Sequence, residues 1–168
     1  MIEIVTVARK AAERVTDPEL PMLTLSDLGV LRDVTVDRSG KVVVTITPTY
    51  TGCPAMDVMR VDLHRSLRAA GFDDIQVATE LSPPWTTDWI SEEGKRKLAE
   101  AGIAPPNRAS SRGDGPVPLR LTPLAHDVDC PRCGSHDTVE LSSFSATACK
   151  SLRSCRSCDE PFEAIKEL

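Results

Sequence analysis

The apolar residues of this chain recur with two different periods, and each period predicts one kind of element. Near the N-terminus they follow one another at steps of three or four residues, at Ile4, Ala8, Ala11 and Val15. This spacing gathers them on one face of an amphipathic helix over residues 2–15. Pro18 and Pro21 then predict the end of the helix, because proline cannot continue it.

Alternation of apolar and polar residues predicts strands further along the chain. Residues 30–36 and 41–47 alternate in this way, and Arg38-Ser39-Gly40 supplies the bend of a β-hairpin between them. Residues 75–81 form the third predicted strand.

A helical period returns after Cys53 and continues to about residue 70, with apolar residues at Met56, Met59, Leu63 and Leu67. A shorter helix is expected over residues 91–101, capped by Ser91. The order helix, hairpin, helix, strand, helix predicts an α+β domain over residues 1–104, a small sheet with helices on one side.

The remaining third of the chain has a different character. Residues 105–125 are rich in Ser, Gly and Pro and are predicted to be a linker. Residues 126–168 contain two Cys-x-x-Cys pairs, Cys130/Cys133 and Cys155/Cys158, with 21 residues between them. This spacing is typical of a zinc ribbon with four thiolate ligands, in which the ion holds the fold together and does not catalyse.

Composition narrows the classes of function. The chain has 25 acidic and 20 basic residues without a basic stripe, which disfavours a nucleic-acid partner. It contains no long apolar run that could span a membrane. Six cysteines without a recognisable export signal predict a reducing, cytoplasmic environment, in which they are thiols or metal ligands.

Cys53 lies at the junction between the second strand and the following helix. Backbone N–H groups and the dipole at a helix start favour a thiolate, so this thiol is predicted to have a lowered pKa and to be reactive. Asp17 and Glu19 are candidate partners of Cys53, and solvated turn residues are the alternative for both. Cys53 could also be a small buried core residue. Cys149 is a second candidate thiol, with Lys150 next to it, or a packing residue of the ribbon.

Trp85 and Trp89 stand out because the chain has only two tryptophans. They either cover the open end of the sheet or form a partner-docking surface, where tryptophan is enriched.

At this point the chain resembles the PaaD family, an accessory component of the bacterial phenylacetyl-CoA epoxidase system. The resemblance rests on Asp17-Pro18-Glu19, Leu28-Gly29 and residues 47–57, 83–89, 102–106, 130–135, 145–150 and 155–162. The first hundred residues also resemble the wider SufT-like family, which is linked to iron–sulfur protein maturation. A further cysteine found near the end of family members has no counterpart after Phe162.

The resemblance implies an accessory or maturation role in phenylacetate catabolism, with zinc in the ribbon and iron or an iron–sulfur cluster carried transiently. It implies the oxygenase and reductase components as partners, and a homodimer through the sheet edge is a further expectation. Catalysis by this chain alone is not expected. A structural or regulatory subunit and a rubredoxin-like electron-transfer protein are the alternatives.

Overall fold

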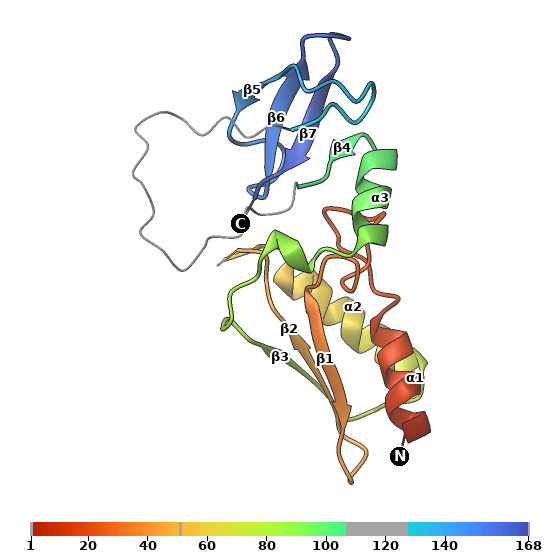
Figure 1. The fold of residues 1–168 in the computed structure, drawn as a ribbon. Coiled ribbons are helices and arrows are strands. Elements are labelled where there is room, and N and C mark those ends of the chain that lie inside the picture. Colours follow the sequence, from red (N-terminus) through yellow and green to blue (C-terminus); the bar gives the residue numbers. More distant parts are fainter. Residues whose placement is uncertain (1, 51, 107–127, 168) are drawn as a thin grey trace, which may run out of the picture. The chain divides into compact units, whose positions relative to one another are not determined.

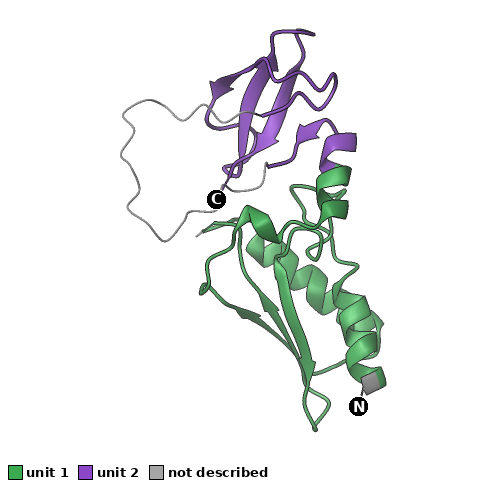
Figure 2. Cartoon of the chain, in the orientation of Figure 1, with its two compact units in different colours: residues 1–97 green, residues 98–168 purple. Residues whose placement is uncertain are grey.

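The computed structural model describes residues 2–50, 52–106 and 128–167, and the chain divides into two compact units, residues 1–97 and 98–168 (Figure 1, Figure 2). The boundary falls inside α3. The elements that begin in unit 1 are α1 (Ile2–Ala12), β1 (Leu31–Val36), β2 (Val42–Ile46), α2 (Met56–Ala69), β3 (Ile75–Thr79), the 3₁₀ helix η1 (Thr87–Trp89) and α3 (Glu92–Glu100).

The strands of unit 1 form a sheet in the order β1-β2-β3. β1 and β2 are antiparallel, as a hairpin requires, whereas β2 and β3 are parallel. A parallel pair needs a crossover connection, which α2 provides. α1 and α2 lie on one side of the sheet (Figure 1), so the predicted α+β layer is confirmed.

One face of β2 forms the centre of the core. Val42, Val44 and Ile46 have no exposed surface, and the residues between them are half-buried. Leu63 and Leu67 of α2 are also fully buried, on the stripe that the helical period predicts. The helical and the alternating spacing of apolar residues in the sequence therefore correctly predict which side of each helix or strand faces the core.

α2 begins later than the sequence predicts. The helix starts at Met56 with Ala55 as its N-cap, so Cys53 and Pro54 lie in a turn before it. The Met56 N–H donates to the Cys53 carbonyl oxygen at 3.3 Å and closes this turn. Cys53 thus lies at the strand-to-helix junction, as predicted, but ahead of the helix start, because a separate turn carries the chain from the sheet into the helix.

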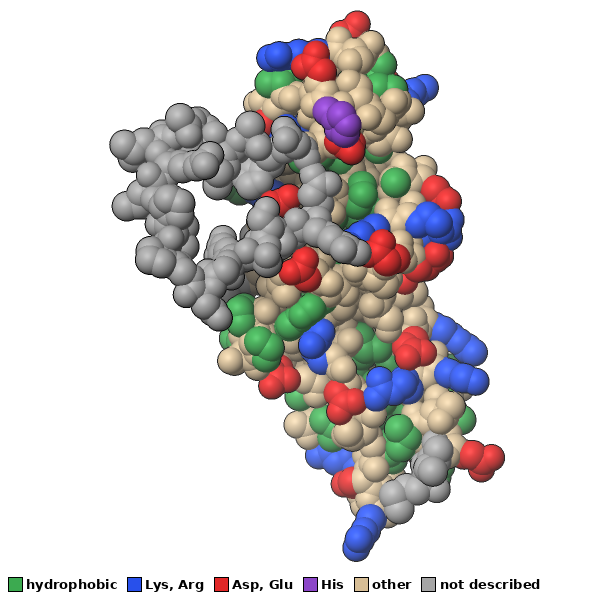
Figure 3. All heavy atoms as spheres, viewed as in Figure 1, with side chains coloured by type: hydrophobic (Ala, Val, Ile, Leu, Met, Phe, Trp, Pro, Cys, Tyr) green, Lys and Arg blue, Asp and Glu red, His purple; other side chains and the backbone are tan. Residues whose placement is uncertain are grey.

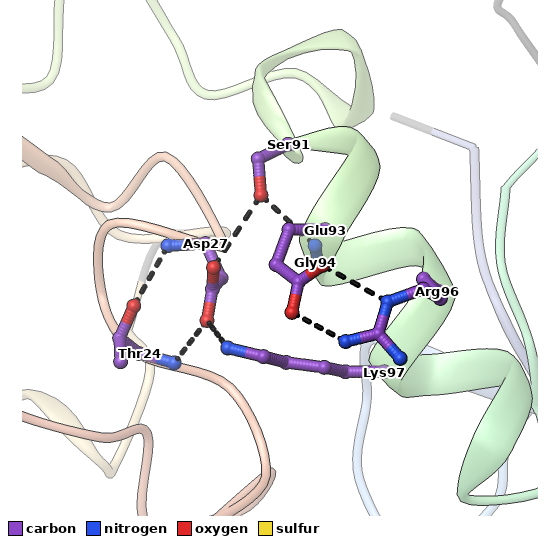
Figure 4. A network of polar contacts seen from close by, with 7 residues as sticks. All are labelled: Thr24, Asp27, Ser91, Glu93, Gly94, Arg96 and Lys97. Carbon is purple, nitrogen blue, oxygen red and sulfur yellow. Dashed lines mark hydrogen bonds and ion pairs between the residues drawn. The ribbon is translucent and has the colours of Figure 1, made fainter.

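A polar network fixes the start of α3 to the turn around Asp27 (Figure 4). The Asp27 carboxylate accepts hydrogen bonds from Lys97 Nζ at 2.7 Å and from the Thr24 N–H at 2.9 Å. The Ser91 N–H donates to the Asp27 carbonyl oxygen at 2.8 Å, and Ser91 Oγ accepts from the Gly94 N–H at 2.9 Å. Ser91 is thus the cap of this helix, as its position in the sequence predicts.

Unit 2 contains a four-stranded sheet in the order β4-β7-β6-β5. Its strands are β4 (Ile103–Ala104), β5 (Thr138–Ser142), β6 (Lys150–Cys155) and β7 (Pro161–Ile165). β5, β6 and β7 pair in antiparallel fashion, and the short β4 adds to β7 in parallel. The sequence did not predict that β4 joins the ribbon sheet. The limits of the first domain at residue 104 and of the ribbon at residue 126 stay predictions.

Apart from Pro105 and Pro106, the predicted linker lies outside the described residues. Within the described ranges, no helix has both the length and the apolar character that a bilayer crossing requires.

Candidate metal centre and thiol site

The cysteines of the two Cys-x-x-Cys pairs come together at one end of the unit 2 sheet. The loop that carries each pair is called a knuckle: the first contains Cys130 and Cys133, and the second contains Cys155 and Cys158. Cys130 and Cys133 precede β5, Cys155 ends β6, and Cys158 lies in the turn to β7. The four Sγ atoms all lie within 4.8 Å of one another, and no other such group of three or more His, Cys, Asp or Glu occurs among the described residues.

The spacing of the sulfurs fits a tetrahedral ion. Zn–S bonds of about 2.3 Å imply S–S edges of about 3.8 Å in a regular tetrahedron. The Sγ atoms of Cys130 and Cys158 are 3.8 Å apart, and those of Cys133 and Cys155 are 3.6 Å apart. The set of four soft thiolate donors therefore fits zinc, which would hold the two knuckles together and leave no coordination position open.

Both knuckles have the same backbone form although their sequences differ. Gly134 follows the first pair with φ 72°, and Asp159 follows the second with φ 56°. The N–H groups of Ser135 and Glu160, each one residue further on, donate to the sulfurs of Cys133 and Cys158. The second pair therefore needs no glycine for this N–H contact, because Asp159 itself adopts the left-handed conformation.

The thiols of this centre differ in acidity. Burial opposes ionisation of Cys155, but the N–H groups of Cys158 and Ser157, together with hydrogen bonds from neighbouring thiols, outweigh it and lower the pKa of Cys155 to about 7. The Glu160 N–H favours the Cys158 thiolate, whereas burial and the neighbouring thiols act against it and raise the pKa of Cys158 to about 12. Four thiols this close cannot all ionise without a cation, which is the expected property of a metal centre.

Polar contacts cross from one knuckle to the other around the cysteines. Arg132 of the first pairs with Glu160 of the second at 2.9 Å. Ser135 Oγ and Ser157 Oγ are 2.7 Å apart and share a hydrogen bond. These contacts bring the two loops together at the position that the metal requires.

Cys53 is the candidate thiol of unit 1, and the structure buries it. Its exposed fraction is 8%. The Ala55 N–H and the Tyr50 side chain make hydrogen bonds to its sulfur that favour the thiolate. Burial nevertheless dominates and raises the pKa of the Cys53 thiol, and the negative charges of Glu19 and Asp17 add to the effect. The prediction of a lowered pKa is therefore wrong, because desolvation outweighs the N–H groups.

The structure does bring Asp17 and Glu19 close enough to act on Cys53. Asp17 is 5% exposed, and its Oδ1 accepts from the N–H groups of Glu19 and Leu20 at 2.8 and 2.9 Å. It therefore also fixes the turn that carries Glu19. Tyr50 is the contact of Cys53 that sequence reasoning missed, and its place three residues before Cys53 was the only signal for it.

Cys149 is partly exposed, and its Sγ lies 3.1 Å from Thr147 Oγ1. The neighbouring Lys150 has a buried Nζ that pairs with Glu163 on β7 at 2.6 Å.

The two tryptophans have different surroundings. Trp85 is 7% exposed and donates from Nε1 to the Leu28 carbonyl oxygen at 2.8 Å, which argues against a docking role for it. Trp89 is half-buried, and the Arg32 guanidinium carbon lies 3.5 Å from its ring centre.

Two known families match different parts of the chain. Residues 7–78 match a family described as iron–sulfur cluster assembly protein, and residues 114–166 match the PaaD zinc beta ribbon domain. A solved domain of unknown function DUF59 from Bacillus anthracis covers 58% of this chain and 92% of its own, at 29% identity and a TM-score of 0.53. The fold and the cysteine centre thus define an iron–sulfur-assembly-type domain that carries a zinc ribbon.

Sequence relatives narrow the class further. An Escherichia coli (strain K12) protein, provisionally named as one of the subunits of 1,2-phenylacetyl-CoA epoxidase, is 40% identical over 153 residues, which cover 91% of this chain and 87% of that protein. The chain belongs to this family, the PaaD proteins. A Porphyromonas gingivalis protein named Fe-S protein maturation auxiliary factor is 34% identical over 85 residues, or 50% of this chain and 80% of its own.

Proposed function

We propose that this protein is an accessory factor of a phenylacetyl-CoA ring-epoxidising oxygenase and helps to assemble or maintain its iron or iron–sulfur centres. The observation that carries the proposal is the arrangement in unit 1, where a single cysteine lies close to two acidic residues in a domain related to iron–sulfur maturation factors. The E. coli relative is named as an epoxidase subunit, which points to the same complex.

In this proposal Cys53 is the transient ligand of the cargo. A thiolate is the usual protein ligand of iron–sulfur clusters, and Asp17 or Glu19 offers a hard oxygen ligand for iron. Metal binding releases the thiol proton, so the buried position keeps the sulfur neutral until a cation arrives. Cys149 is a second candidate thiol without a defined role.

The zinc ribbon has a separate role in the proposed function. Zinc held by Cys130, Cys133, Cys155 and Cys158 supplies structure, and the ribbon offers a surface for a client protein. The clients are the oxygenase component and its reductase, and the setting is the cytoplasm, which suits described cysteines that form no disulfide. A homodimer could form along β1 or β3, the two edges of the unit 1 sheet.

The test is metal loading of the client. The client complex is produced in cells that carry wild-type protein, Cys53→Ser or Cys149→Ser, and its iron and acid-labile sulfide are measured with its epoxidase activity. Cys53→Ser should reduce loading to the level found without this protein, whereas the matched Cys149→Ser should leave it near wild type. Full loading with Cys53→Ser would refute the role of Cys53.

Burial of Cys53 favours a second candidate, a structural or regulatory component that does not transfer metal. This candidate predicts normal loading with Cys53→Ser but loss of the intact complex when the whole protein is removed. An electron-transfer role would require iron in the ribbon, and the purified protein would then be coloured instead of containing one colourless zinc.

A further inference from the structure

Arg32 is aimed by an irregularity in β1. Leu31 pairs with Ile46 and Asp33 pairs with Thr45, so Arg32 is an extra residue between two consecutive positions of β2. This is the pattern of a β-bulge, which turns a side chain away from its regular direction and is frequent next to functional sites.

The Arg32 side chain lies against the Trp89 ring. The Arg32 guanidinium carbon lies 3.5 Å from the centre of the Trp89 ring, and Arg32 Nη1 donates weakly to the Gly29 carbonyl oxygen at 3.4 Å. Gly29 has φ 69° and lies so close to Trp89 that a Cβ there would be 2.5 Å from the Trp89 Cβ. The Trp89 backbone and Cβ are therefore packed against the Gly29 backbone, which fixes the position of the residue whose ring faces the guanidinium.

Arg32 is exposed, and across the described residues no carboxylate forms an ion pair with it. Arg9, Arg60 and Arg65 of unit 1 pair with a nearby aspartate, whereas Arg38 in the hairpin bend has no ion pair within the described ranges either. The Arg32 side chain is positioned by the bulge and by the Trp89 ring, and no carboxylate of the described residues pairs with it. Its guanidinium therefore keeps hydrogen-bond donors available for an acceptor on another molecule.

We infer that Arg32 and Trp89 form a docking point for an Asp or Glu carboxylate on the surface of a partner protein. Arginine and tryptophan are the residues most enriched at the energetic centres of protein interfaces. On the face drawn in Figure 3, Lys and Arg side chains stand among Asp and Glu side chains. The inference rests on the proposed function for the identity of the partner, the client oxygenase.

The experiment measures binding of the full-length protein to the purified client complex by biolayer interferometry at two salt concentrations. Arg32→Gln should weaken binding by about 30-fold, which corresponds to the loss of an interface contact of about 2 kcal/mol. Arg32→Lys keeps the charge but loses the planar fork, and it should weaken binding less. Arg38→Gln is the matched control, since it removes the same charge from the exposed bend of the same hairpin.

Equal binding by wild type and Arg32→Gln, or equal losses with Arg32→Gln and Arg38→Gln, would overturn the inference. Competition by free phosphate or coenzyme A at constant ionic strength would assign the site to a small anion and would also overturn it. If the wild-type protein does not bind the client complex at all, the inference is also overturned. The two proposals fail separately. Normal metal loading with Cys53→Ser together with weak binding of Arg32→Gln refutes only the metal-transfer role, and the reverse pair of results refutes only the docking point.

Discussion

Replacement of Gly29 by alanine tests whether the turn before β1 and the tryptophan support are as tightly joined as the structure indicates. Gly29 has φ 69°, and an added Cβ would lie 2.5 Å from the Trp89 Cβ and 2.7 Å from the Trp89 carbonyl oxygen. The second of these neighbours is backbone, which cannot move aside as a long side chain can. Either the turn or η1 must shift.

The expected cost has two parts. An L-residue in the left-handed region costs about 1–2 kcal/mol. Crowding of a well-packed site costs a further 1–3 kcal/mol or so. Gly40 provides the matched control, since its φ is 90° but a Cβ there would meet nothing within 4 Å. Gly40→Ala should therefore show the first cost alone, and Gly29→Ala should be less stable than Gly40→Ala by about 1–3 kcal/mol.

Urea unfolding followed by tryptophan fluorescence is a suitable assay, because both tryptophans of the chain lie in unit 1. With a slope near 2 kcal/mol/M, the midpoint of Gly29→Ala should lie about 0.5–1.5 M below that of Gly40→Ala. Equal midpoints would mean that Trp89 is not held against Gly29. The support proposed for Arg32 would then lose its rigidity.

Three further predictions concern pH, knuckle geometry and metal. Burial opposes ionisation of Asp27, but hydrogen bonds from Lys97 and Thr24 hold its pKa below the usual range. Its stabilisation is therefore present above the unfolded-state pKa and is lost as pH falls through the lower folded-state pKa. In urea unfolding, Asp27→Asn should be less stable than wild type by about 1–2 kcal/mol near neutral pH, and this gap should close in acid. Asp159→Gly should bind zinc as wild type does, whereas Asp159→Val should bind it about tenfold more weakly in chelator competition, because a β-branched residue is strained at φ 56°. Removal of metal by a chelator should abolish hydrogen-exchange protection in β5–β7 but leave it unchanged in β1–β3, because two of the six members of the small ribbon core, Cys130 and Cys155, are candidate ligands.

The sequence predicted most where a local pattern is sufficient. The alternation of β1 and β2 and the stripe on α2 report directly which side chains meet the core. The two Cys-x-x-Cys pairs predicted the metal centre because their spacing alone limits how four sulfurs can meet. In each case the information lies within a few neighbouring residues.

Features that depend on distant contacts could not be predicted in the same way. The raised pKa of Cys53 comes first from burial, which requires the packed fold. Trp85 is buried, and its indole N–H donates to the carbonyl oxygen of Leu28, which lies 57 residues earlier in the sequence. The bulge that exposes Arg32 follows from the register between β1 and β2, and no turn residue in the sequence marks it.

The difference between the two sulfur sites bears on how the protein could pass metal on. The ribbon brings four thiols within 4.8 Å of one another, a complete ligand set that leaves a tetrahedral ion no open position. Cys53 belongs to no such set among the described residues, and Asp17 and Glu19 add negative charge near it. Iron or a cluster held there would need its remaining ligands from the donor, the client or a second copy of this chain. A site that is incomplete by itself holds cargo weakly after the other ligands leave, which is the property that transfer requires and storage does not.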